Sequence, residues 1–386
     1  MSRATPPYST PDGRDSSNTV AAIREMLAND PLPPQPDQLR ERAIGLAAQL
    51  APLAPADELR ALATAAVAEL NGLGPLQPLL ADPRITEIVI NNGGDVWVER
   101  DGRMERSGRL SADVTPRLVE RILGPLGRRV DRLSPIVDAR LADGSRLCAV
   151  IAPIAVDGPC LALRRFSATR RRLTDFTTRP VAELLRDIVV SRCNVLVSGA
   201  TSSGKTSLLN ALASEIRQGE RIITLEDIAE LRLDADHVLR LETRPANADG
   251  TGAISMAELV RTSLRLRPDR IVVGEVRGGE VVDMLQALNT GHDGSLSTCH
   301  ANSARDALRR MESLLVQHTA GWPIEAVRDE VGRSLDVVVH VERRADGGRA
   351  VAEVVEVADC GAWPTQRERT LASRGDVVGT LLRRRM

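Results

Sequence analysis

The sequence contains a single lysine, so arginine supplies all the other members of its 51 basic residues. Aromatic residues make up only 2% of the chain, which argues against the aromatic stacking platforms that bind single-stranded nucleic acids. The net charge is −1, so no global electrostatic field attracts nucleic acid and any such contact needs a local patch. We therefore expect no direct nucleic-acid binding.

The cysteines are also few and widely spaced, and no C-x-x-C pair occurs: Cys148, Cys160, Cys193, Cys299 and Cys360. This pattern predicts neither a disulfide framework nor a zinc knuckle. No stretch approaches the ~18 uninterrupted apolar residues of a membrane span, and the N-terminus has no apolar signal core. These absences predict a cytoplasmic protein in a reducing compartment.

The lone lysine stands in a glycine-rich motif of the form G-x-x-x-x-G-K-[ST], between an apolar run and a helical pattern. The motif consists of Gly199, Ala200, Thr201, Ser202, Ser203, Gly204, Lys205, Thr206 and Ser207. Backbone N–H groups of such a loop surround phosphates, the lysine reaches the β- and γ-phosphates, and the hydroxyl after it holds Mg²⁺. A compact ammonium fits this cradle and a planar guanidinium does not. The only lysine of the chain therefore favours a phosphate site over a glycine turn, and predicts ATP and Mg²⁺ as cofactors.

Composition and periodicity divide the chain into five parts. Residues 1–36 are rich in Pro, Ser and Asp and predict a mobile, disordered arm with at most a short helix over Val20–Leu27. The alanine- and leucine-rich pattern of residues 37–72 predicts helices, with a break near Pro52 and Pro55. The remaining parts are an α+β domain over 73–167, an arginine-rich linker over 168–179 and a larger domain over 180–386.

The larger domain alternates strand and helix patterns, which predicts an α/β fold with a parallel sheet flanked by helices. A hairpin turn at Asp346-Gly347-Gly348 separates two valine-rich runs and predicts an antiparallel pair near the end of this domain. The last fifteen residues are basic, and we expect them to be loose.

Two apolar runs end in acids. Arg270–Glu275 has the form of a Walker B strand, and Glu275 there can hold the Mg²⁺ shell or polarise the attacking water. The run Thr224–Asp227 ends in the pair Glu226 and Asp227, and paired carboxylates beside a Mg–nucleotide site suit activation of water. The candidate metal ligands are Thr206, Glu275 and Asp227. The alternative is that Asp227 caps a short helix over residues 228–231.

Two of the five histidines, His292 and His300, bound one expected strand. A metal pair would need a third ligand, and nothing at ligand spacing supplies one. We therefore expect this pair to sense the γ-phosphate and to pass the nucleotide state to the next strand. The other histidines are expected to be structural.

In order along the chain, the P-loop, Leu225-Glu226-Asp227, Val273–Gly278 and the histidine segment from Thr290 to Asn302 resemble the secretion-ATPase superfamily of type II and type IV secretion. The segments Leu241–Pro245, Leu163–Phe166 and Asp138–Arg146 are similar to its CpaF branch, which assembles tight-adherence (Flp-type) pili. The resemblance covers about residues 73–357. Cys299 departs from the aliphatic residue that is more common there.

The resemblance implies a RecA-like ATPase domain after a smaller α+β domain, assembled as a homo-hexamer, with nucleotide bound where the domains of neighbouring subunits meet. It implies Glu275 and Glu226 as catalytic acids, together with Lys205, His292, His300 and Arg265. It also implies Arg164 and Arg165 as nucleotide-binding residues, with Arg140, Arg244 and Arg277 as further candidates. The expected partners are inner-membrane platform proteins, with pilin or secreted cargo moved indirectly. These partners would place the protein at the inner face of the cytoplasmic membrane.

Two other classes stay open at this point. One is a nucleotide-gated scaffold with little turnover, which phosphate release would identify. The other is a conjugation-type transfer motor, which a gel-shift assay with DNA would identify.

Overall fold

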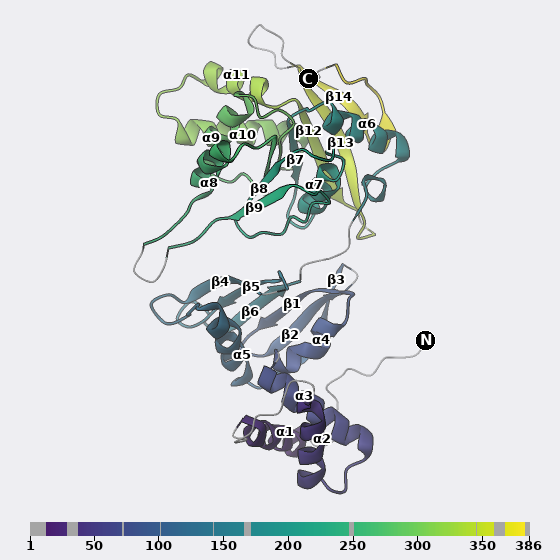
Figure 1. Ribbon diagram of the computed structural model, residues 1–386, viewed down its shortest axis with the longest axis vertical. Coiled ribbons are helices and arrows are strands. Elements are labelled where there is room, and N and C mark those ends of the chain that lie inside the picture. The colour runs from purple at the N-terminus through teal and green to yellow at the C-terminus, as the bar shows by residue number, and fades with distance from the viewer. Residues whose placement is uncertain are drawn as a thin grey trace. The chain divides into compact units, whose positions relative to one another are not determined.

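The computed structural model describes residues 13–28, 38–71, 73–100, 102–141, 143–165, 171–246, 251–344, 346–358 and 367–382. The chain forms two compact units, residues 1–167 and 168–386, and each is described by itself (Figure 1). Within the described residues, every helix is too short or too polar to cross a lipid bilayer.

Unit 1 begins with helices α1 (Gly13–Ala28), α2 (Leu39–Leu50) and α3 (Ala56–Asn71). They pack through an apolar cluster that includes Ile23 and Leu27 of α1. The break expected near Pro52 and Pro55 lies between α2 and α3. Residues 13–28, which were expected to be mostly irregular, form a helix instead, because these apolar side chains find partners on α2 and α3. The rest of the expected arm, 1–12 and 29–36, lies outside the described residues.

The second part of unit 1 is an antiparallel sheet with the strand order β3-β2-β1-β6-β5-β4. Its strands are β1 (Ile85–Asn91), β2 (Asp95–Arg100), β3 (Arg103–Arg109), β4 (Ile136–Arg140), β5 (Arg146–Val150) and β6 (Cys160–Arg164). The helical segments are η1 (Gly74–Leu76), α4 (Gln77–Ala81), α5 (Val114–Leu123) and η2 (Gly124–Leu126). Except in β3, whose side chains are exposed or half-buried, alternate side chains of the strands are buried against α5 and its neighbours in one core.

Unit 2 alternates helix and strand. Its helices are η3 (Leu173–Asp175), α6 (Arg179–Val190), α7 (Lys205–Ala213), α8 (Met256–Ser263), η4 (Leu264–Leu266), α9 (Glu280–Leu288), α10 (Ala304–His318) and α11 (Ile324–Ser334). Its strands are β7 (Val195–Gly199), β8 (Ile222–Glu226), β9 (Val238–Glu242), β10 (Arg270–Val273), β11 (Leu296–His300), β12 (Val337–Arg343), β13 (Arg349–Ala358), β14 (Arg367–Ser373) and β15 (Asp376–Val377).

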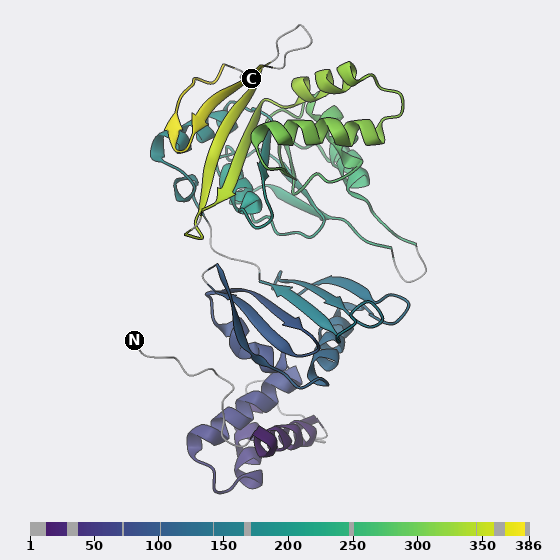
Figure 2. The ribbon, with the colours of Figure 1, turned by 180° about the vertical axis from the view of Figure 1, so that it is seen from behind.

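The sheet of unit 2 has the order β15-β14-β13-β12-β7-β11-β10-β8-β9. From β12 to β9, each strand is parallel to its neighbours. The strands from β13 onward are antiparallel, and Figure 2 shows β12 and β13 as the long pair next to β14. The expected parallel sheet and the expected hairpin are both confirmed.

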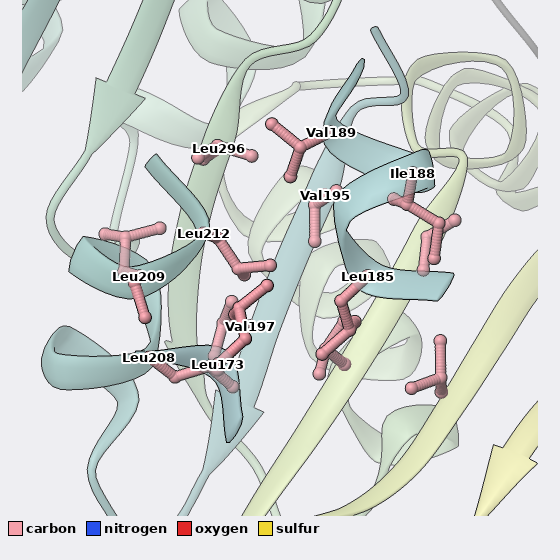
Figure 3. Close-up of a cluster of buried hydrophobic side chains, with 14 of the residues drawn as sticks. Leu173, Leu185, Ile188, Val189, Val195, Val197, Leu208, Leu209, Leu212 and Leu296 are labelled. Carbon is pink, nitrogen blue, oxygen red and sulfur yellow. The ribbon is translucent and has the colours of Figure 1, made fainter. Parts of the chain in front are cut away.

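Helices cover both faces of this sheet. On one face, α6 and α7 pack against β7 through leucine, isoleucine and valine side chains such as Leu185, Leu208 and Val197 (Figure 3). On the other face, α8 to α11 bury a second cluster around Leu196 and Ile223. Because β7 is buried on both faces, every residue of this strand is buried, as expected for a central parallel strand.

The C-terminal part is more ordered than the sequence predicts. Residues 372–382 were expected to be loose, but Ala372 ends up buried in β14, and β15 pairs with β14. Leu371 and Leu381 join the core beneath α6. Burial of these apolar side chains orders the segment despite its basic composition. Residues 383–386 lie outside the described part.

Candidate functional site

The glycine loop joins the end of β7 to the start of α7 at the carboxyl edge of the parallel sheet. Gly204, the last residue before α7, has φ 103°, a conformation that glycine adopts without a steric penalty. A side chain on Gly199 would collide with Ser203 Oγ and with the carbonyl oxygen of Val341. The two glycines of the motif are therefore required, one by its backbone conformation and the other by close packing.

Lys205 is the first residue of α7 and is only 7% exposed. Its Nζ donates hydrogen bonds to the carbonyl oxygens of Gly199 (3.0 Å) and Ala200 (2.9 Å). The same atom lies 3.2 Å from Nδ1 of His300. The ammonium is thus held between the loop and the end of β11, which pairs with β7 so that His300 lies beside Gly199.

His300 links Lys205 to Glu275, the acid predicted to end a Walker B strand. Its Nε2 lies 2.9 Å from Oε1 of Glu275. Burial and then the Lys205 charge lower the pKa of His300 below its usual value, which favours the neutral ring. Because Lys205 donates to Nδ1, the proton of the neutral imidazole is on Nε2, the ring nitrogen nearer to Glu275. Among the described groups, Glu275 Oε1 still has no hydrogen bond of good geometry, so this contact is mainly electrostatic.

Arg277 extends these contacts to Asp227, the acid that follows β8. Its Nη2 lies 2.6 Å from Oε2 of Glu275, and its Nη1 lies 3.6 Å from Oδ2 of Asp227. These carboxylates raise the pKa of Arg277 further. Arg277 was one of several arginine candidates in the sequence. It could not be singled out there, because its contact with Asp227 depends on β10 and β8 being neighbours.

Glu226 ends β8 and is 3% exposed. Its Oε1 accepts hydrogen bonds from the backbone N–H groups of Glu230 and Leu231, both at 2.8 Å. Burial raises the pKa of this carboxyl to about 7. Residues 228–231 form no helix, so the alternative that Asp227 caps a short helix there is wrong. In its place, the Glu226 carboxylate holds this loop.

The residues around the loop fit a Mg–nucleotide. Three buried oxygens at this edge lack a hydrogen-bond partner within the described part of the chain: Ser203 Oγ, Glu226 Oε2 and Glu275 Oε1. No three His, Cys, Asp or Glu side chains of the described residues gather as a metal site. Mg²⁺ commonly binds through one or two carboxylates plus substrate phosphates. The donor set therefore suits a metal that arrives with its nucleotide.

His292 lies at the opposite edge of the sheet from His300. It precedes β11, a strand of five residues that begins beside the first residue of β7, and its Nδ1 is 3.1 Å from the carbonyl oxygen of Ala287. The strand separates the two ends by about 13 Å at ~3.3 Å per residue. Within unit 2, His300 therefore reaches the loop and His292 does not, and the expected role of the pair as a γ-phosphate sensor stays a prediction.

Arg265 is also away from the loop within unit 2. It is exposed in η4, ahead of the amino end of β10. In unit 1, Arg164 ends β6 and is exposed, while Arg165 Nη1 donates to the carbonyl oxygens of Asp82 and Ile85. Arg165 thus stabilises the start of β1, and any role of these arginines toward nucleotide stays a prediction.

A model of the family described as "Type II/IV secretion system protein" matches residues 69–361. A putative conjugal transfer protein of Mycobacterium tuberculosis is 39% identical over 74% of this chain and 84% of its own length. The type IV secretion system protein PtlH of Bordetella pertussis is 36% identical over 74% of this chain and 93% of its own length.

The fold is similar to that of the Legionella pneumophila ATPase DotB. The TM-score is 0.54 and the identity is 21%, over 72% of this chain and 78% of that one. The α/β architecture of unit 2 is accordingly RecA-like. The extent of the family match and the identity to its relatives show that this chain belongs to the type II/IV secretion system protein family.

Proposed function

We propose that this protein hydrolyses ATP and, as a homo-hexamer, uses the energy to move pilin or secreted protein through an inner-membrane platform. The observation that carries the proposal is the continuous set of contacts from Lys205 through His300 to Glu275. It connects a phosphate-binding cation with a carboxylate that has an available oxygen. Phosphoryl transfer needs these two features, a cation for the developing charge and a group that orients water.

The residues have distinct roles in this proposal. Lys205 binds the terminal phosphates, and Glu275 orients and polarises the attacking water. His300 holds both side chains in place, and Arg277 fixes Glu275 from its other side. Mg²⁺, held by Thr206 with Glu275 or Asp227, would neutralise phosphate charge when it is bound. Glu226 holds the loop after β8 in shape. It is the third acid of the proposed site, with Glu275 and Asp227.

The hexamer rests on the resemblance and on the separation of catalytic parts between the units. Arginines of unit 1, such as Arg164, would act on nucleotide held by unit 2 of a neighbouring subunit. An arginine supplied in this way contributes roughly a thousandfold or more in P-loop enzymes. The CpaF-like motifs favour assembly of tight-adherence pili, and partners would hold the protein at the inner face of the cytoplasmic membrane.

Steady-state phosphate release from the full chain tests the proposal, with light scattering to follow assembly. Specific activity should rise with concentration as subunits associate. Lys205→Ala subunits mixed into wild type should lower activity more than dilution predicts. ATP binding without turnover in the assembled protein would support the nucleotide-gated scaffold. Equal activity of a dilute monomer would exclude the ring mechanism.

A conjugation-type transfer motor is the second candidate, favoured by the name of the 39% identical mycobacterial relative. It predicts that DNA shifts the protein in a gel and stimulates phosphate release. The first candidate predicts neither effect, because the chain has a net charge of −1 and few aromatic residues. A pull-down from membranes would then identify the platform protein.

A further inference from the structure

The hairpin of β12 and β13 packs directly against the phosphate loop of the same unit. Strand β12 pairs in parallel with β7 up to the pair His340 and Ser198, whose side chains lie 2.9 Å apart. One residue further on, the carbonyl oxygen of Val341 occupies the space beside Gly199 that a side chain would need. The hairpin therefore borders the loop where it leaves β7.

Arg349, the first residue of β13, borders the other end of the loop. A Cβ atom on Gly204 would lie 2.6 Å from Cδ of Arg349 and 3.3 Å from both its Cγ and its Nε. The aliphatic part of Arg349 thus crosses the open face of the glycine that precedes Lys205. The side chain is partly buried. Its Nε, the first nitrogen of the guanidinium, lies next to this glycine.

We propose that Arg349 is a phosphate-binding residue that contacts the polyphosphate of the nucleotide held by its own unit. The backbone N–H groups of this loop hold phosphates, and Gly204 is the last glycine before the helix. The two Nη atoms of Arg349 lie two bonds beyond Nε, so the guanidinium can reach a phosphate bound at Gly204. Arginine binds phosphate through paired N–H donors, whereas Lys205 supplies a compact charge, so the two cations have complementary roles. The proposal rests on the nucleotide site proposed above.

The proposal also explains a constraint on the sequence. Any side chain at position 204 would displace the stem of Arg349, in addition to the strain at φ 103°. A residue of the C-terminal hairpin is thereby placed against a loop that lies about 150 residues earlier in the chain. Sequence reasoning could not select Arg349, because it stands after a hairpin turn and resembles any exposed arginine.

Binding of Mg–ADP and of inorganic pyrophosphate to the full chain tests the proposal, measured by displacement of a fluorescent nucleotide. Arg349→Met keeps the stem over Gly204 and removes the charge. We expect this variant to bind both ligands roughly tenfold more weakly, the scale of one charge-assisted hydrogen bond. The melting temperature of the free protein should be unchanged. Arg349→Lys should lose less. The control Arg344→Met removes an exposed arginine of the same hairpin and should change neither affinity.

Equal affinities of wild type and Arg349→Met would overturn the proposal. A loss for ADP with no loss for pyrophosphate would also overturn it, since the contact would then be with the base or ribose. If Arg349→Met does not fold, the comparison of Arg349→Lys with wild type decides, because the bidentate fork alone is lost. Failure of the wild-type protein itself to bind Mg–ADP would instead refute the proposed function, and Lys205→Ala serves as the reference for a lost site.

Discussion

Lys205 and His300 are in direct contact, with 3.2 Å between Nζ of the lysine and Nδ1 of the imidazole. The contact exists because β7 and β11 are neighbours in register, so that the last residue of β11 lies beside the first glycine of the loop. His300 also contacts Glu275, so consecutive contacts connect the three side chains. The first predictions concern these three residues.

Lys205→Arg should lower ATP turnover by orders of magnitude, nearly as much as Lys205→Ala. The Nζ atom is enclosed by two loop carbonyls and His300, and the planar guanidinium is too large for this position. Phosphate release measures the effect. Arg186→Lys, an exposed arginine of α6 paired with Glu215, is the control for a conservative exchange. Near-full activity of Lys205→Arg would refute the argument from the lone lysine.

Glu275→Gln should retain nucleotide binding and lose turnover. The amide keeps the shape of the side chain but not the charge that polarises water, and it weakens the 2.6 Å contact with Arg277. Nucleotide affinity and phosphate release are measured separately. Glu312→Gln, which changes a carboxylate on α10 paired with Arg328, should leave both intact. Lost affinity with normal turnover per bound nucleotide would contradict the assignment.

The turnover of the wild-type enzyme should fall as the pH drops below about 6.5, the ordinary pKa of histidine. Burial and Lys205 lower the pKa of His300, so the ring is neutral at pH 7, and its protonation at lower pH places a second cation against Lys205. His300→Asn retains an acceptor but cannot titrate, so its acid limb should disappear while its maximum rate decreases. A pH–rate profile checks this. An unchanged acid limb in the variant would assign the limb to another group.

Glu226→Gln should stabilise the protein at alkaline pH relative to wild type. Burial raises the pKa of Glu226 to about 7 from 4.5, so the folded state binds the proton more tightly than the unfolded state. Wild-type stability from this group is complete below pH 4.5 and is lost as the pH rises through 7. The difference should reach on the order of 1–3 kcal/mol at pH 8.5 and shrink toward pH 5. Urea unfolding at the two pH values measures it, and a constant difference would exclude this titration.

The sequence specified the loop and most of the sheet because their signals are local. Buried apolar runs predict β7, β8 and β10, and the acids that follow them stand at the carboxyl edge. Other features depend on tertiary context. The chain has many arginines, and nothing local distinguishes Arg277 or Arg349. The separation of His292 from His300 was readable, since residues on either side of a strand lie at opposite sheet edges. Helix α11 carries Val327 and Val331 at a four-residue spacing that also predicts a helix.

A different constraint explains the last glycine of the histidine segment. The side chain of Arg270 is fully buried, and its Nη1 donates to the carbonyl oxygens of Val189 and Gly294. Glu220 balances its charge through Nε at 2.7 Å. A Cβ atom on Gly294 would collide with Nη1 of this arginine and lie 2.8 Å from its Cζ. The glycine therefore leaves room for a buried ion pair at the amino edge of the sheet.

Gly294→Ala should lower the free energy of unfolding by about 2–4 kcal/mol, because it combines overpacking and displacement of a buried ion pair with an unfavourable backbone conformation. Gly291→Ala is the matched control, since Gly291 also has a positive φ of 98° but its Cβ would meet no atom within 4 Å. The control should lose only about 1 kcal/mol for backbone strain. Chemical denaturation of both variants measures the difference. Equal losses would show that backbone conformation alone, and not the space around Arg270, requires glycine at position 294.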